Sequence, residues 1–195
     1  MPKIFTNIAA AILSGGKASR LGGIAKGNLV VHNNKTIIQH LLDEIKISDI
    51  HDTIIVANEV AAYENYNVPI VADLWRDIGP LAGIASAVDY YIKKQPQYTA
   101  ILILPCDLPN ITSTEISKLV KAFYFYQKPI VFAATAENKL HPLCAVINCN
   151  ILPQLKYAIT KKHYKIRYIW HILGAATVIF QHKKNFHNIN SDEDF

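Results

Sequence analysis

The sequence has no apolar run of the roughly 20 residues that a membrane-spanning helix needs. Cysteine is also scarce: the chain has only Cys106, Cys144 and Cys149, and no two of them form a C-x-x-C pair. An odd number of isolated cysteines argues against a disulfide framework and against a structural zinc site, and it favours a reducing compartment. We therefore expect a cytoplasmic protein that does not enter a membrane.

Charged side chains are few as well. They make up 18% of the 195 residues, whereas apolar side chains make up 51%. This balance is typical of a well-packed globular protein. A chain of this length fits one domain, which we expect to span residues 1–195. The net charge is +5, but the basic residues are scattered, and the one local cluster, at 161–167, has no interleaved aromatic RNA-binding signature. The balance permits a nucleic-acid partner but equally suits a small polyanionic substrate, and without such a signature we expect no nucleic-acid partner.

Short apolar runs alternate with segments of helical periodicity. The expected strands are Ile8–Leu13, Thr53–Ala57, Val68–Ala72, Ala100–Leu104, Pro129–Ala133, Cys144–Ile147 and Ala176–Phe180. The expected helices are Thr36–Ile47, Leu81–Lys93, Ser113–Tyr126 and Tyr157–Leu173. This alternation predicts an α/β protein with a single doubly wound, mostly parallel sheet flanked by helices, a Rossmann-like arrangement. In such sheets ligands bind beyond the carboxyl ends of the strands.

A glycine-rich loop follows the first expected strand. Between Ser14 and Lys26 it contains four glycines and three cations, Lys17, Arg20 and Lys26. Gly15 and Gly16 allow a sharp turn whose bare N–H groups approach an anion, and the guanidinium of Arg20 can fork onto phosphate oxygens. The loop matches neither the P-loop pattern nor the G-x-G-x-x-G dinucleotide pattern. It therefore predicts a phosphate site of another kind.

Two acidic residues follow two other expected strands. Asp107 comes after Ala100–Leu104, and Asp73 comes after Val68–Ala72. Either could by itself be a turn or cap residue, but both are expected at the same sheet edge as the glycine loop. Magnesium that bridges a triphosphate and a protein uses one or two carboxylates, and Asp107 could supply one. Cys106 has no histidine–acid arrangement beside it and is expected to be a small core residue.

These motifs, taken in order, resemble those of the molybdenum cofactor guanylyltransferases of the MobA type. The opening Leu13-Ser14-Gly15-Gly16-x-x-x-Arg20-Leu21-Gly22-x-x-x-Lys26 is similar to their L-A-G-G…R-M-G…D-K signature. The likeness continues at Asn34-Lys35-Thr36 with Gln39-His40, Gly79-Pro80-Leu81-Ala82-Gly83, Pro105-Cys106-Asp107-Leu108-Pro109, His141-Pro142 and Asn188-Ile189-Asn190-Ser191. Several matched motifs in the same order are far more specific than any one of them.

The resemblance implies an enzyme that transfers GMP from GTP to molybdenum-bound molybdopterin and releases pyrophosphate, with Mg²⁺ as cofactor. It implies transient contact with proteins that deliver molybdopterin or mature molybdoenzymes. The implied catalytic residues are Arg20, Lys26 and Asp107, with Asp107 also binding the metal. The implied GTP contacts are Leu13, Ser14, Gly15, Gly16, Lys26, Asn58, Asp73 and Asp107, and the implied pterin contacts are His141, Pro142, Asn188 and Asn190.

The chain departs from the family pattern at several positions. Ala25 stands where the family usually has an aspartate, Ser14 replaces an alanine, and Asn28 stands where an apolar residue is usual. Together these departures leave open a weaker enzyme or a relative with altered substrate choice. The rival functions are a related transferase, such as a molybdopterin cytidylyltransferase or a sugar-phosphate or terpenoid-precursor nucleotidyltransferase, a non-catalytic nucleotide-binding relative, and a nucleic-acid binder. The Gly15-Gly16 pair and the G-P-L-A-G motif favour the guanylyl type.

Overall fold

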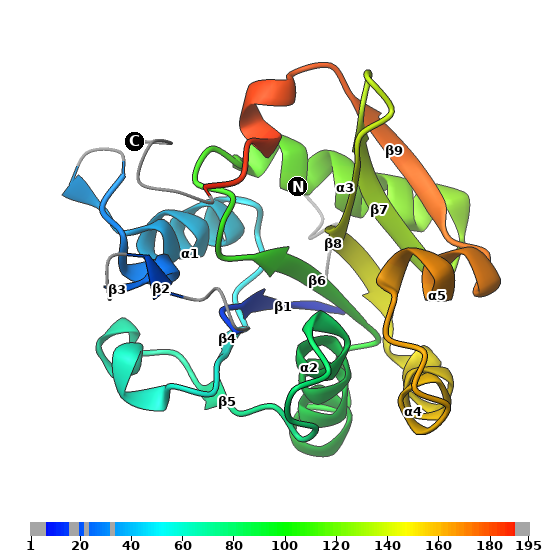
Figure 1. Cartoon of the computed structure of the whole chain (residues 1–195). Helices are drawn as coiled ribbons and strands as arrows, with labels where there is room; N and C mark the ends of the chain where they lie inside the picture. The colour runs from blue at the N-terminus through cyan, green and yellow to red at the C-terminus, as the bar shows by residue number, and fades with distance from the viewer. Residues whose placement is uncertain (1–6, 16–19, 22–23, 32–33, 190–195) are drawn as a thin grey trace.

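The computed structural model describes residues 7–15, 20–21, 24–31 and 34–189, with only the backbone at Arg20 and Leu21 (Figure 1). Its centre is a seven-stranded sheet in the order β5-β4-β1-β6-β8-β7-β9. The strands are β1 (Ile8–Leu13), β4 (Thr53–Val56), β5 (Ile70–Val71), β6 (Ala100–Pro105), β7 (Ile130–Thr135), β8 (Leu140–Asn148) and β9 (Ala176–Phe180). A separate two-stranded ribbon pairs β2 (Arg20–Leu21) with β3 (Ile24–Ala25).

Six strands of the main sheet run in the same direction and β8 opposes them. β1 pairs in parallel with β4 and β6, whereas β8 is antiparallel to both β6 and β7. The chain proceeds outward from β1 to β4 and β5, and then returns to the other side of β1 at β6. This reversal creates a crevice beyond the carboxyl ends of β1 and β6, which is the usual ligand position in such sheets. The predicted doubly wound, mostly parallel sheet is confirmed.

Helices cover both faces of the sheet (Figure 1). Alternate residues of each central strand face opposite sides: Ala10 and Ile12 join one core, and Ala9 and Ala11 join the other. The first core includes α1 (Ile37–Ile47) and α3 (Ser113–Tyr126), and the second includes α2 (Pro80–Lys94), α4 (Leu152–Thr160) and α5 (Ile166–Ile172). Because both faces are covered, the strands can be apolar throughout.

The helix ends follow the chemistry of the local sequence. Thr36 caps α1 by accepting the Gln39 N–H at 3.2 Å, and at α3 the Thr112 N–H donates to Glu115 Oε2 at 3.1 Å. Short 3-10 turns lie between the larger elements, among them η1 (Lys26–Asn28), η3 (Val60–Ala62), η4 (Glu64–Tyr66), η5 (Cys149–Ile151) and η6 (Lys183–Phe186). Within the described ranges, every helix is too short or too polar to cross a membrane.

The expected helix Tyr157–Leu173 is wrong. The structure has two helices, α4 and α5, separated by residues 161–165. Lys162 in this connection has φ 57°, a left-handed conformation that ends a right-handed helix. The apolar residues on both sides of the break pack on the same core, which explains why their spacing resembles one long amphipathic helix.

The expected strand Cys144–Ile147 begins later in the sequence than the observed strand. β8 starts at Leu140, so His141 and Pro142 lie inside the strand and not before it. The pairing with β7 shifts register there: His141 pairs with Ala133, whereas Ala145 pairs with Phe132. Pro142 lies within this irregularity, where a residue without an N–H interrupts no regular ladder bond.

Candidate active site

A cleft of about 630 Å³ opens beyond the carboxyl ends of β1, β4 and β6. It lies at the reversal of strand order, and glycines, the cation Lys26 and acids from separate loops converge on it. Its lining residues are Leu13, Ser14, Gly15, Ala25, Lys26, Val56, Asn58, Glu59, Tyr63, Asp73, Asp77, Gly79, Pro80, Gly83, Pro105, Cys106, Asp107 and Leu143.

The described part of the glycine loop forms one wall of the cleft. The Ser14 N–H donates to the Val56 carbonyl at 2.8 Å, which holds the loop against β4 as it leaves β1. Gly15 is exposed, and a Cβ added to it would lie 3.7 Å from Asp73 Oδ2. The loop therefore begins directly beside an acid from another strand. Of the other residues predicted for this loop, Gly16 lies outside the described residues, and Arg20 is described only by its backbone in β2.

Lys26 enters the cleft from the short turn η1. Its side chain is almost fully buried, with 7% of its surface exposed, and Nζ donates to the Ile189 carbonyl at 3.0 Å. A lysine ammonium has three donors, so this bond leaves it able to bind phosphate as well. The next residue must be small, because a Cβ at Gly27 would lie 2.6 Å from Ile38 Cγ1. The close packing of η1 on α1 thus fixes the base of the Lys26 side chain.

Asp107 lies two residues beyond the end of β6. Its Oδ2 accepts a hydrogen bond from Asn188 Nδ2 at 3.0 Å, and its carbonyl accepts from the Ile189 N–H at 3.0 Å. Its Oδ1 is buried without a hydrogen-bond partner among the described residues. Burial raises the pKa of this carboxyl, and the bond from Asn188 and the charge of Lys26 offset part of the increase.

Asn58 and Asp73 form a reciprocal pair across the ends of β4 and β5. Asn58 Nδ2 donates to Asp73 Oδ2 at 3.0 Å, and the Asp73 N–H donates to Asn58 Oδ1 at 3.1 Å. Burial raises the pKa of Asp73, and the hydrogen bond from Asn58 partly counteracts it. These two of the implied GTP contacts therefore lie together on one wall of the cleft.

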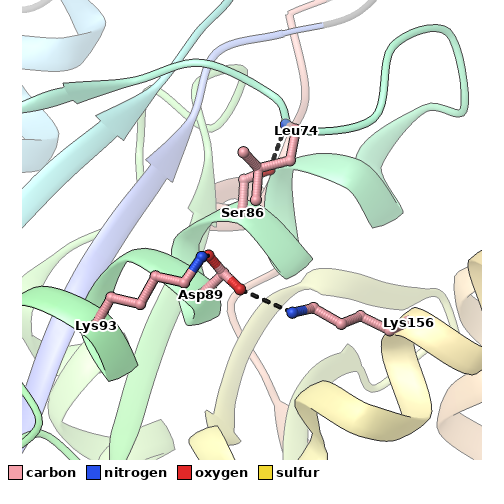
Figure 2. A network of polar contacts seen from close by, with 5 residues as sticks. All are labelled: Leu74, Ser86, Asp89, Lys93 and Lys156. Carbon is pink, nitrogen blue, oxygen red and sulfur yellow. Dashed lines mark hydrogen bonds and ion pairs between the residues drawn. The ribbon is translucent and has the colours of Figure 1, made fainter.

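Helix α2 also makes a hydrogen bond to the backbone of this wall. The Leu74 N–H, directly after Asp73, donates to the hydroxyl of buried Ser86 at 2.9 Å. Figure 2 shows this bond together with Asp89, which lies farther along α2 and makes ion pairs with Lys93 and Lys156. The backbone at Asp73 is thus fixed on both sides by side chains.

Sequence reasoning missed several residues of the cleft, namely Glu59, Tyr63 and Asp77. Tyr63 is buried, and its hydroxyl accepts a short hydrogen bond from the Ser14 hydroxyl. These residues lie in the connections between β4 and α2, where no recognised motif indicated them. Asp77 and Gly79 have positive φ values of 61° and 76°, and the G-P pair at Gly79 was the available signal of a turn there.

Cys106 lines the cleft but is almost fully buried. Burial raises the pKa of its thiol to about 11, so it stays protonated near neutral pH. This agrees with its expected role as a small core residue.

A second cavity of about 550 Å³ adjoins the first and shares Pro105, Asp107 and Leu143 with it. Three of the predicted pterin contacts, His141, Pro142 and Asn188, line this cavity, and Asn190 lies outside the described residues. Both His141 Nε2 and Asn188 Oδ1 are buried without a partner in the described chain. Desolvation lowers the pKa of His141 to about 4, so its ring is neutral near pH 7. Asp107 therefore lies at the junction of two cavities.

Comparisons with known proteins identify the family of this chain. The profile of the MobA-like NTP transferase domain matches residues 10–177. A molybdenum cofactor guanylyltransferase from Serratia proteamaculans is 30% identical over 191 residues, covering 96% of this chain and 91% of that protein. Another protein of that name, from Polynucleobacter asymbioticus, is also 30% identical, over 193 residues, covering 96% and 94% of the two chains.

A solved structure shows the same fold. The molybdopterin-guanine dinucleotide biosynthesis protein A of Archaeoglobus fulgidus superposes with a TM-score of 0.76 at 20% identity, covering 95% of this chain and 94% of that one. The extent of the profile match and the identity to the curated relatives together establish the family. The chain belongs to the MobA-like NTP transferases, and it is a nucleotidyltransferase enzyme.

Proposed function

We propose that this protein transfers GMP from GTP to molybdenum-bound molybdopterin, forming the guanine dinucleotide cofactor and releasing pyrophosphate. The observation that supports this most strongly is the position of Asp107 at the junction of two adjoining cavities. A transferase must hold its donor and its acceptor in contact, and a shared wall with a carboxylate provides that proximity. Curated relatives carry the name molybdenum cofactor guanylyltransferase, which supports this proposal.

The larger cavity is our proposed GTP site. The backbone of Leu13, Ser14 and Gly15, together with Gly16, would face the phosphates, and Lys26 would contribute a fixed positive charge. The Asn58–Asp73 pair presents an amide and a carboxylate on the same wall. Such a pair can recognise hydroxyl or N–H groups of a nucleoside.

We propose that Mg²⁺ binds at Asp107 together with the triphosphate. The residue fits a cation, because its buried Oδ1 lacks a hydrogen-bond partner in the described chain and carboxylate oxygen is a preferred magnesium ligand. The described residues contain no group of three or more His, Cys, Asp or Glu that could hold a metal. Magnesium shared with a nucleotide needs only one or two carboxylates, and when bound it neutralises negative charge on the phosphates.

The protein's own groups would then lower the repulsion between two polyanions. A phosphate nucleophile is already ionised at neutral pH, so no strong general base is needed. Lys26 and Arg20 would offset charge that develops on the leaving pyrophosphate, and the walls of the cavity would keep donor and acceptor in line. Lys26 suits this role because its bond to Ile189 restricts its position before substrate binds.

The smaller cavity is our proposed pterin site. His141 and Asn188 provide buried polar atoms that lack partners among the described residues, and Asn190 would extend this set. Because His141 is neutral, it would act as a hydrogen-bonding group and not as a cation.

We further propose that residues 1–195 act as one domain in the cytoplasm, with transient contacts to proteins that deliver molybdopterin or receive the product. All three cysteines are buried and free, which suits a reducing compartment.

The decisive experiment is to measure pyrophosphate release with molybdenum-loaded molybdopterin, magnesium and each of GTP, CTP, ATP and UTP. We expect turnover with GTP, and Asp107→Asn should lower it by at least about a hundredfold, the typical loss for one preorganised electrostatic contact. Asp43→Asn removes an exposed carboxylate paired with Lys35 and is the matched control. A preference for CTP, or nucleotide binding without pyrophosphate release, would overturn the proposal.

A further inference from the structure

The connection between β4 and β5 carries two 3-10 turns, η3 and η4, with Tyr63 between them. The Tyr63 ring is 1% exposed, although the residue lines the larger cavity. Its ring lies against the turn that contains Lys26, since a Cβ added to Gly27 would be 3.1 Å from Tyr63 Cε1. Any shift of this ring would therefore disturb the residue next to Lys26.

The hydroxyl of the same side chain reaches the glycine loop. Ser14 donates a short hydrogen bond to it, and the Ser14 side chain is itself buried. The Ser14 hydroxyl also hydrogen-bonds the buried thiol of Cys106, which precedes Asp107. Tyr63 thus joins two segments, the loop after β1 and the η1 turn, that are separate in the sequence and face the same cavity.

The segment that carries Tyr63 is anchored to the η1 turn at a second point. Asn28 Nδ2 donates to the Ala62 carbonyl at 2.8 Å, and the Tyr66 hydroxyl donates to Asn28 Oδ1 at 2.7 Å. The Tyr66 hydroxyl also lies 2.8 Å from the hydroxyl of Thr36, the residue that caps α1. Because of these bonds, the segment and the turn should move as one unit.

We propose that Tyr63 is a positioning residue for nucleotide binding: its hydroxyl and ring set the glycine loop at a fixed distance from Lys26. Two groups that bind one triphosphate gain affinity when their spacing is fixed before the ligand arrives, because less conformational freedom is lost on binding. This inference rests on the proposed nucleotide site. It assigns Tyr63 no contact with the reacting atoms.

The test compares Tyr63→Phe with the wild type in binding titrations with two probes, GTP with magnesium and guanosine. The substitution keeps the ring against Gly27 and removes only the hydroxyl. We expect the Kd for GTP to rise about tenfold, a difference of about 1.4 kcal/mol, whereas the Kd for guanosine, which has no phosphate, should stay unchanged. Tyr168→Phe, which removes a hydroxyl from a half-exposed ring on α5, is the control and should leave both values as in the wild type.

A double-mutant cycle with Ser14→Ala isolates the hydrogen bond. If the bond positions the loop, the double variant should bind GTP no more weakly than either single variant. Ser14→Ala also provides an independent measurement if Tyr63→Phe folds poorly. Unchanged GTP binding in both single variants, or equal losses for GTP and guanosine, would overturn the inference. The proposed function is judged separately, because it fails if the wild type itself does not bind GTP or release pyrophosphate.

Discussion

At the scale of single residues, Ser14, Ala25 and Asn28 differ from what the family usually has at these positions. Two of these three side chains make hydrogen bonds in this chain. Ser14 donates to the Tyr63 hydroxyl, and Asn28 donates to the Ala62 carbonyl and accepts from the Tyr66 hydroxyl. Ala25 provides no carboxylate near Lys26, whose ammonium is held instead by the Ile189 carbonyl. The differences at positions 14 and 28 are therefore part of one contact network.

His141 should make the stability of the protein depend on pH. Its pKa is about 4 in the folded protein, whereas an unperturbed histidine has a pKa of about 6.5. Between these values the unfolded chain binds more protons, so stability falls as the pH is lowered through this window. We expect His141→Gln to lose less thermal stability than the wild type between about pH 7 and about pH 4.5, measured as the change in Tm.

Asp73 and Asp107 change the pH dependence of stability in the opposite direction. Burial raises the pKa of both carboxyls in the folded protein, so their contribution to stability rises as the pH falls. They are present in the wild type and in the variant, so the difference between the two proteins isolates His141. An identical fall of Tm in both would contradict the prediction.

At the scale of elements, α2 connects the active-site wall to the rest of the second core. Its N-terminus follows Gly79, whose φ of 76° favours glycine, and Pro80 occupies the first turn. Farther along, Ser86 fixes the backbone after Asp73, and Asp89 links α2 to α4 through Lys156. One helix therefore both positions a site residue and joins neighbouring elements.

The Asp89 ion pairs should stabilise this arrangement. Asp89 is 6% exposed, and its oxygens lie 2.6 Å from Lys93 Nζ and 2.8 Å from Lys156 Nζ. Burial opposes ionisation of this carboxyl, but the hydrogen bonds from Lys156 and Lys93 outweigh it and lower its pKa. The stabilisation should therefore be present above about pH 3.9, the unperturbed aspartate value, and be lost as the pH falls through the lower folded pKa.

We expect Asp89→Ala to lower the free energy of unfolding by about 1 kcal/mol, more than an exposed pair but less than a fully buried one, because both lysines are partly exposed. For a protein of this size that corresponds to a fall in Tm of about 2–4 °C. Asp43→Ala, which removes the exposed pair with Lys35, should change Tm by much less. Equal effects of the two substitutions in thermal unfolding would refute the prediction.

At the scale of the whole molecule, the last described residues complete a site that begins near the N-terminus. The bond between Lys26 and Ile189 joins residues 163 positions apart. Asn188 and Ile189 also bond Asp107, and Ile189 is buried in the core with α1 and α3. The segment thus holds two proposed catalytic side chains in their relative positions.

A chain that ends at Phe186 should therefore bind GTP with magnesium more weakly than the whole chain. We expect its Kd to rise at least about tenfold, since Lys26 loses a charge-assisted hydrogen bond of about 1.5–3 kcal/mol and becomes free to move. The control is a chain that ends at Ile189, which keeps all the described contacts and should bind GTP as the whole chain does. Equal GTP binding by the two shortened chains would show that the segment does not position Lys26.

Local patterns in the sequence determined most of the fold. The apolar runs at Ile8–Leu13 and Ala100–Leu104 predicted buried strands, and the expected helix Ser113–Tyr126 has the bounds of α3. The order of the motifs also indicated the family. In contrast, the break between α4 and α5 escaped prediction, because the periodicity of side chains on a shared core continues across a change in backbone direction.

Only the tertiary structure decided which distant side chains meet. The sequence placed Lys26 and Asp107 after strands that end at one sheet edge, but no local pattern indicated that the 187–189 segment joins them or that Tyr63 contacts Ser14. The reason is physical: propensity and periodicity act over a few neighbouring residues, whereas these contacts depend on how complete elements pack. The sequence thus predicted a phosphate site in the glycine loop, and the contacts that support the described part of this loop became visible only in the folded chain.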